Sequence, residues 1–206
     1  SGSGKSTLLY SVSGLDTIDS GSISLDGVDL TSLTADGLAD TRRERMGFVF
    51  QQPTLLRNLG LLENIVLTSS LDRIGTAGDR VERARELMER AGIWELRDRM
   101  PSQVSGGQLQ RAGICRALMR RPRIVFCDEP TGALNSLAAA EVMGLLEEIN
   151  ADGTSLLVVS HDAHVAARAD RVVFMRDGRI VDELAPTGSG EERVRVLTEQ
   201  LSHLGI

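Results

Sequence analysis

Apolar residues recur along this chain with two different periods, and each period predicts a different element. Between positions 81 and 91 the apolar residues are spaced as on one face of a helix, and the same spacing returns at 142–149. Short apolar runs at 46–50, 124–127 and 155–159 have the length of buried strands. Strands that alternate with helices in this way predict an α/β fold, with a parallel sheet covered by helices on both faces.

Two other segments alternate apolar and polar residues around an Asp-Gly pair, which is the pattern of a β-hairpin. They are residues 21–30 and 171–183. A Pro/Gly-containing linker at 186–190 follows, and beyond it four apolar residues recur at helical spacing: Val194, Leu197, Leu201 and Leu204. We expect this short amphipathic helix to dock on the body of the protein.

Composition narrows the class of protein. The chain has 206 residues, of which 41% are hydrophobic and 25% charged, as in soluble globular domains. A net charge of −6 without a basic block argues against nucleic-acid binding, and no apolar run approaches the roughly 18 residues of a membrane span. No apolar stretch of a secretory signal follows the opening residues, so we expect a protein that is not secreted. Cys115 and Cys127 lie in apolar contexts, which favours core residues of a cytosolic protein.

A glycine-rich segment, Ser3-Gly4-Lys5-Ser6-Thr7, runs directly into an apolar helix. Backbone N–H groups at a helix start bind phosphate, glycines let the backbone approach, and a lysine meets the outer phosphates. Ser6 is placed to ligate Mg²⁺. Lys5 is the only lysine of the chain, which fits both an arginine-rich codon bias and a need for a compact ammonium group. An ordinary turn that opens a helix remains the alternative.

Polar side chains follow three of the predicted strands. Gln51 follows the first, Asp128 and Glu129 end the second, and His161 follows the third. Ligands of open α/β sheets bind at the carboxyl ends of the strands. One carboxylate for Mg²⁺ and one that deprotonates a water are what nucleotide hydrolysis requires. Gln51 is within reach of Mg²⁺ or of the attacking water, and a structural histidine is the alternative for His161.

A second helix start carries the sequence Ser105-Gly106-Gly107-Gln108. Its serine and its N–H groups suit a second anion site, and a capped helix is the alternative. Five segments in order resemble ATP-binding cassette (ABC) ATPases: SGSGKST at 1–7, FVFQQ at 48–52, VSGGQLQR at 104–111, IVFCDEPTGAL at 124–134 and VVSHD at 158–162. The residues in and around these motifs are similar to those of the subgroup that serves lipoprotein-release, macrolide-export and cell-division permeases.

The resemblance implies a P-loop NTPase sheet with an inserted helical subdomain and an antiparallel β-hairpin region. The ABC ATPase domain would occupy residues 1–185, with the helical subdomain at 51–100, and residues 186–206 would form the linker and the final helix. It further implies a bacterial transporter subunit that hydrolyses ATP to drive a membrane permease. Export, or extraction from the membrane, is the expected direction.

Individual roles also follow from the resemblance. Ser6, Gln51 and Asp128 would hold Mg²⁺. Glu129 would be the general base, while Gln51 and His161 would complete the catalytic group, the histidine contacting the γ-phosphate. The residues implied to bind ATP are Gly2, Ser3, Gly4, Lys5, Ser6 and Thr7 in one copy, and Ser105, Gly106, Gly107 and Gln108 in a second copy of the domain.

The implied assembly is a head-to-tail homodimer with two ATP molecules sandwiched between the copies. An integral membrane permease would hold it, peripherally, at the cytoplasmic face of the inner membrane. Five leucines would form a groove for the permease or, for the most part, subdomain core: Leu55, Leu56, Leu59, Leu61 and Leu62. A non-transport ABC protein is disfavoured, because the chain has one cassette and no sustained heptads.

The chain also departs from the family pattern. It starts after the first glycine of the phosphate loop, the strand before it and the aromatic residue that stacks on adenine. We therefore expect exposed sheet edges and weak nucleotide binding, and a truncated, catalytically silent fragment is the alternative function. Asn135 replaces an aspartate of the dimer interface, and Val104 replaces a leucine.

Overall fold

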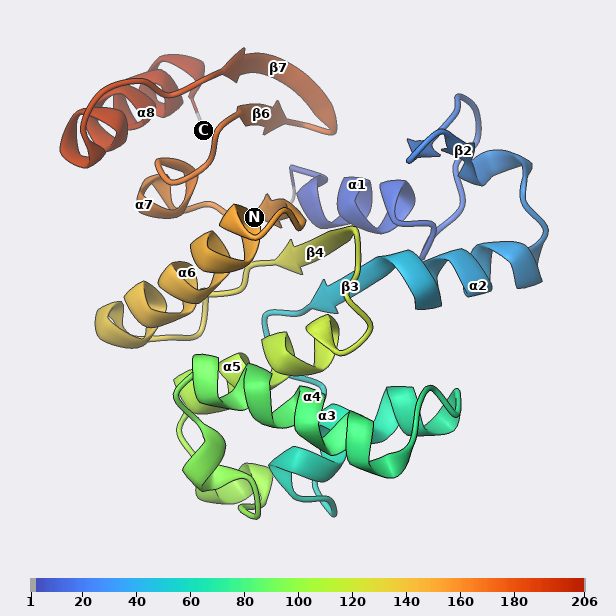
Figure 1. Ribbon diagram of the computed structural model, residues 1–206. Helices are drawn as coiled ribbons and strands as arrows, with labels where there is room; N and C mark the ends of the chain where they lie inside the picture. Colours follow the sequence, from blue (N-terminus) through green and yellow to red (C-terminus); the bar gives the residue numbers. More distant parts are fainter. Residues whose placement is uncertain (1–2, 206) are drawn as a thin grey trace.

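A three-stranded parallel sheet lies at the centre of the computed structural model, which describes residues 3–205 (Figure 1). The strands lie in the order β3-β4-β5, and Ile124 of β4 is opposite both Met46 and Ser155. The helices are α1 (Lys5–Val12), α2 (Ala35–Arg45), α3 (Leu61–Leu71), α4 (Ala77–Arg90), α5 (Gly106–Leu118), α6 (Ser136–Ala151), α7 (Ala163–Ala166) and α8 (Gly190–Leu204). The strands are β1 (Ser24–Leu25), β2 (Val28–Asp29), β3 (Met46–Val49), β4 (Ile124–Asp128), β5 (Ser155–Val159), β6 (Val172–Arg176) and β7 (Arg179–Leu184), and 3₁₀ turns lie at Leu30–Ser32, Trp94–Leu96 and Pro101–Gln103.

Helices cover both faces of the sheet, as the apolar runs predict. Successive side chains of a strand point to opposite faces. Val125 and Cys127 therefore pack with α5 and α6, whereas Phe126 packs with Leu9 of α1 on the other face. Both faces of β4 are thus buried, which explains its continuous apolar sequence.

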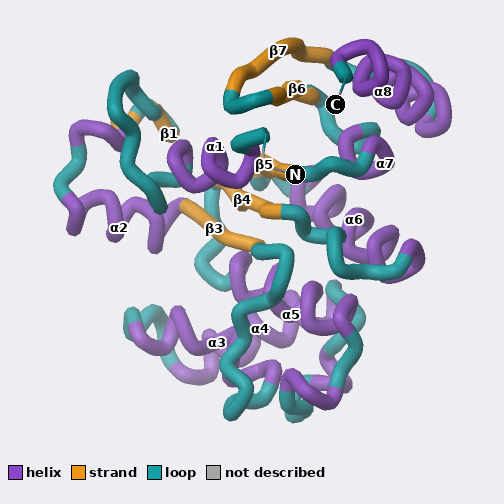
Figure 2. Tube along the Cα trace, turned by 180° about the vertical axis from the view of Figure 1, so that it is seen from behind, coloured by secondary structure: helices purple, strands orange, loops and turns teal. Residues whose placement is uncertain are grey.

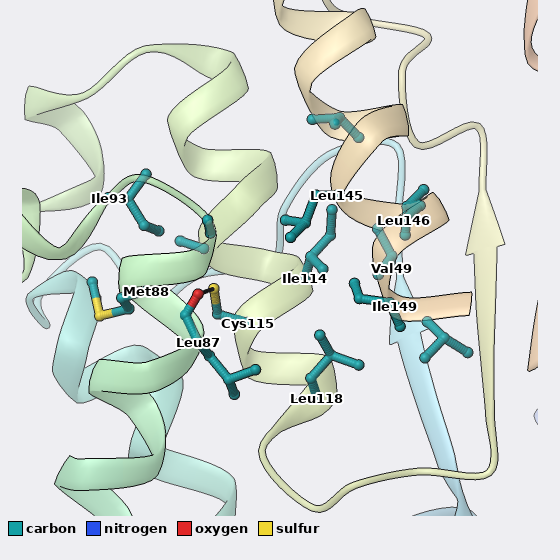
Figure 3. Packing of buried hydrophobic residues seen from close by; sticks show 14 of the residues in the cluster. Val49, Leu87, Met88, Ile93, Ile114, Cys115, Leu118, Leu145, Leu146 and Ile149 are labelled. Carbon is teal, nitrogen blue, oxygen red and sulfur yellow. Dashed lines mark hydrogen bonds between the residues drawn. The ribbon is translucent and has the colours of Figure 1, made fainter. Parts of the chain in front are cut away.

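Helices α3, α4 and α5 gather at one end of the molecule, and β6, β7 and α8 lie at the other end (Figures 1 and 2). Leu61, Ile65 and Met88 in the helical group are completely buried. Figure 3 shows the same core continuing through α5 to α6. Cys115 lies inside it, with its thiol donating to the Leu87 carbonyl oxygen over 3.4 Å.

Burial raises the pKa of the Cys115 thiol, and that of Cys127, to about 12. Both thiols stay protonated at neutral pH and are unreactive. The prediction that the two cysteines are core residues is confirmed.

Both predicted hairpins form, with Asp26 and Asp177 in the left-handed backbone region at the turns. The final amphipathic helix is α8, and it docks as predicted. Its buried Leu197 packs against Phe174 of β6 and Ala167 beyond α7. None of the helices in residues 3–205 combines the length and the apolar character that crossing a bilayer requires.

The sheet edge formed by β5 carries no further strand among the described residues. A largely apolar groove of about 380 Å³ runs between β5 and the β6–β7 hairpin, with Leu8, Leu156 and Val173 among its lining residues.

Candidate functional site

The carboxyl ends of the three parallel strands meet at one edge of the sheet. Val49 at the end of β3 is opposite Cys127, and Asp128 is opposite Val159 at the end of β5. The polar residues that follow the strands are thereby brought to one edge, where open α/β sheets bind ligands.

Helix α1 starts at this edge, and the residue before it has a backbone conformation that favours glycine. Gly4, the N-cap, has a φ of 86°, in the left-handed region that favours glycine. A Cβ added there would lie 3.3 Å from the Cα of Gly178, and the Gly178 N–H donates to the Ser3 carbonyl over 3.1 Å. The turn of the β6–β7 hairpin is therefore seated against the glycine loop. Gly2 lies outside the described residues.

The first turn of α1 leaves its N–H groups without a side-chain cap. Uncapped N–H groups together with the helix dipole favour an anion at this position. Lys5 opens the helix and donates from Nζ to Ser3 Oγ over 2.8 Å. Thr7 follows in the same turn with an exposed side chain.

Asp128 faces this helix and accepts two hydroxyl hydrogen bonds. Ser6 Oγ donates to Oδ1 over 2.8 Å, and the Tyr10 hydroxyl donates to Oδ2 over 2.7 Å. The bond to Asp128, then burial and the aspartate charge, raises the pKa of Tyr10 above its ordinary value. The sequence analysis did not single out Tyr10. Tyr10 could have been found from its spacing, because it follows Ser6 by four residues and both hydroxyls therefore lie on one side of α1.

The Ser6–Asp128 pair fits a Mg²⁺ site of the kind completed by a phosphate ligand. Mg²⁺ prefers oxygen ligands and is commonly held by one or two carboxylates together with substrate phosphates. No group of three or more His, Cys, Asp or Glu side chains in residues 3–205 is arranged to hold a metal by itself.

Glu129 lies next to this pair in a strained backbone conformation. Its φ is 48°, which is unusual for a residue other than glycine, and its N–H donates to the Val159 carbonyl over 2.9 Å. Its side chain is only 17% exposed, and its Oε1 lies 2.7 Å from His161 Nδ1. Ser160 Oγ donates to Oε2 over 3.3 Å, a contact that the sequence analysis did not predict.

Gln51 reaches the same edge from β3. A Cβ added to Gly132 would lie 3.1 Å from Gln51 Nε2 and 3.5 Å from the Cβ of Glu129. The amide of Gln51 is therefore beside the loop that follows Glu129. The structure brings together Lys5, Ser6, Gln51, Asp128, Glu129 and His161.

The second predicted anion site is elsewhere. Ser105 is the N-cap of α5 and accepts from the Gln108 N–H over 3.3 Å, while Gln108 Oε1 accepts from the Ser105 N–H over 2.9 Å. These two side chains cap their own helix, and Ser105 and Gly106 are exposed. A Cβ added to Gly107 would lie 2.8 Å from the Cβ of Ala138, so this glycine allows α5 and α6 to pack closely.

Asn135, the departure from the family pattern, caps α6. Its Oδ1 accepts from the Ala138 N–H over 2.9 Å. The capping function that an aspartate would have is therefore retained by the amide.

The model of the family described as "ABC transporter" matches residues 1–132. This chain belongs to the ABC transporter family. It is 46% identical over 187 residues to a probable syringafactin export ATP-binding/permease protein of Pseudomonas syringae pv. syringae, covering 91% of this chain and 28% of that protein. It is also 40% identical to a bacitracin export ATP-binding protein of Halalkalibacterium halodurans, covering 89% of this chain and 73% of that protein.

The solved structures to which the chain is similar include a dimeric ATP-binding cassette bound to ADP and Pi. The TM-score is 0.82 at 37% identity, and the match covers 91% of this chain and 82% of that one. The predicted family and the P-loop NTPase fold are confirmed. Both relatives are named as ATP-binding proteins of export systems. The chain spans about 28% of the length of the first curated relative.

Proposed function

We propose that this chain binds ATP with Mg²⁺ at the carboxyl edge of the sheet, hydrolyses it, and thereby drives a membrane permease in export. The observation that carries the proposal is the arrangement around Asp128 and Glu129. One carboxylate is bonded to the serine of the glycine loop, and the other is held beside a histidine.

The phosphates would bind at the start of α1, where N–H groups are uncapped and Lys5 supplies a point charge. Ser6, Gln51 and Asp128 would hold Mg²⁺, which when bound neutralises charge on the phosphate oxygens. The close approach of Ser6 Oγ and Asp128 Oδ1, at 2.8 Å, supports this assignment.

Glu129 would accept the proton of the attacking water. The water oxygen forms the new bond to the γ-phosphorus, the bond from phosphorus to the ADP oxygen breaks, and the proton passes to the Glu129 carboxylate. His161 and Ser160 orient that carboxylate. His161 would contact the γ-phosphate with its other ring nitrogen, which donates only if the ring is protonated or turns from Glu129.

A second copy of the chain would complete each site. Ser105 and Gly106 are exposed and form no bond to the glycine loop of their own chain in the described region, which leaves this helix start open to another molecule. Solved cassettes similar to this chain are dimeric. We propose a head-to-tail homodimer with ATP between Lys5 of one copy and Ser105 of the other.

The permease partner is supported by the names of the relatives, which are export ATP-binding/permease proteins. In the proposed assembly the chain lies at the cytoplasmic face of the membrane, held by the permease. Of the five leucines considered for its docking groove, Leu61 is fully buried core and Leu56 is 47% exposed. Leu56 is therefore the one we propose to contact the permease.

The substitution Glu129→Gln tests this proposal, because it keeps the shape of the side chain and removes the base. We expect ATP hydrolysis to fall by roughly 10²- to 10⁴-fold while ATP binding persists. Light scattering should then detect an ATP-dependent dimer, which an added Ser105→Ala substitution weakens. Unchanged turnover would contradict the role of Glu129, and a parent chain that binds no ATP would favour the silent fragment.

A further inference from the structure

The segment that carries Gln51 lies along α5, and side chains of that helix bind it on both sides of Gln51. On one side, Gln110 donates from Nε2 to the carbonyl oxygen of Phe50 over 3.0 Å. Gln110 is only 1% exposed. A buried amide requires a partner, and here its partner is the backbone immediately before Gln51.

On the other side, Arg116 binds the backbone three residues after Gln51. Its Nη1 donates to the Thr54 carbonyl over 2.6 Å, and its Nη2 donates to Thr54 Oγ1 over 2.9 Å. Burial lowers the pKa of the Arg116 guanidinium. Within the described part of the chain it forms no ion pair with a carboxylate, so a partly desolvated cation is used to hold a backbone carbonyl.

The middle of the segment also touches α5. A Cβ added to Gly113 would lie 3.6 Å from the Cβ of Pro53, which is ordinary contact distance. Gln110, Gly113 and Arg116 are spaced by three residues and so lie on one side of the helix. Between the two anchored ends, the side chain of Gln51 remains exposed and lies beside Gly132.

We propose that Gln110 and Arg116 are positioning residues that fasten the Gln51 segment to α5. The contacts stand independently of any ligand, whereas their effect on Mg²⁺ rests on the function proposed above.

The first test measures the fastening directly. Arg116→Met removes both bonds to Thr54 and keeps most of the side-chain volume. Arg120→Met is the matched control, because Arg120 lies just beyond α5, has an 18% exposed side chain and pairs with Asp72 instead. By NMR relaxation we expect the backbone order parameters of Gln51, Gln52 and Thr54 to fall from the rigid range, about 0.85, towards roughly 0.6 in Arg116→Met and to stay unchanged in Arg120→Met. Order parameters that stay unchanged in Arg116→Met, or that fall equally in Arg120→Met, would overturn the proposal.

The second test uses the Mg²⁺ dependence of ATP hydrolysis. We expect Arg116→Met and Gln110→Met each to raise the half-saturating Mg²⁺ concentration about three- to tenfold, and the double variant to raise it by less than the product, since both act on one segment. Arg116→Lys restores one donor and should give an intermediate value. Arg120→Met should leave the half-saturating Mg²⁺ concentration unchanged. A general loss of stability would instead change this concentration in both arginine variants.

The two tests separate failure of this inference from failure of the proposed function. Lower order parameters with an unchanged Mg²⁺ dependence would overturn the link from the segment to Mg²⁺. If the parent chain hydrolyses no ATP, the proposed function fails, and the relaxation measurement still decides whether Arg116 holds the segment.

Discussion

Two helices of this molecule begin with glycine and serine, yet their N-terminal ends differ in what the chain places around them. The start of α1 has no side-chain cap and faces Asp128 and the turn at Gly178. The start of α5 is capped by Ser105 and is open to solvent. Unpaired N–H groups are the requirement for an anion site, and a facing carboxylate is the requirement for a metal beside it.

The difference teaches that a glycine-rich helix start is not by itself a complete site. At α1 the glycine conformation leaves the backbone donors free and Lys5 adds charge. At α5 one of these donors, the Gln108 N–H, is already bonded to Ser105. We therefore expect the first end to bind phosphate within one chain and the second to require groups from elsewhere.

The largest effect is expected at the start of α1. Lys5→Ala removes the only lysine and its charge from the proposed phosphate site. A hydrogen bond to a charged group contributes about 1.5–3 kcal/mol, so we expect ATP to bind roughly 100-fold more weakly at unchanged folding stability. Titration with a fluorescent ATP analogue measures the affinity. An equal loss of ATP affinity in monomeric Ser105→Ala would contradict the proposed difference between the starts of α1 and α5.

A smaller effect, on stability instead of binding, is expected at the start of α5. In Gly107→Ala the new methyl group would meet Ala138 at 2.8 Å, and overpacking of this kind costs about 1–3 kcal/mol. Gly106→Ala is the matched control, because its Cβ would lie 3.5 Å from the tip of Leu134. Urea unfolding should show the loss in the first variant alone. Equal stability of the two variants would contradict the packing explanation for Gly107.

A comparison with the sequence shows which parts of the structure could be predicted from it. Apolar runs located the strands, and parallel strands must present their following residues at one edge, so the meeting of Gln51, Asp128 and His161 was predictable. Helix α2 was not, because it has no buried residues and hence no apolar period to detect. The contact between Arg116 and Thr54 joins positions 62 residues apart, which spacing within one helix cannot reveal.

The smallest expected effect concerns Tyr10, whose hydrogen-bond partner differs from that of the corresponding side chain near the start of α5. It lies one turn into α1 and bonds Asp128, whereas Gln110 in the first turns of α5 bonds a backbone carbonyl instead. Tyr10 is the only tyrosine of the chain, so ultraviolet absorbance of tyrosinate reports on this group alone. Because ionisation would remove the hydrogen bond to Asp128, and would also place a second negative charge beside it, we expect the titration midpoint of Tyr10 above the ordinary value of 10.0.

Two variants determine whether Asp128 causes this shift in the pKa of Tyr10. Asp128→Ala should bring the midpoint down towards 10.0, whereas Ser6→Ala removes the other hydroxyl of the pair and should leave it raised. A raised pKa in the folded state means that the unfolded chain loses its proton first as the pH rises. The free energy of unfolding should therefore decline above about pH 10 in the parent, and less steeply in Tyr10→Phe. A parent midpoint at or below 10.0 would show that Asp128 is not bonded to Tyr10 in solution, and the start of α1 would then lack the support that distinguishes it from α5.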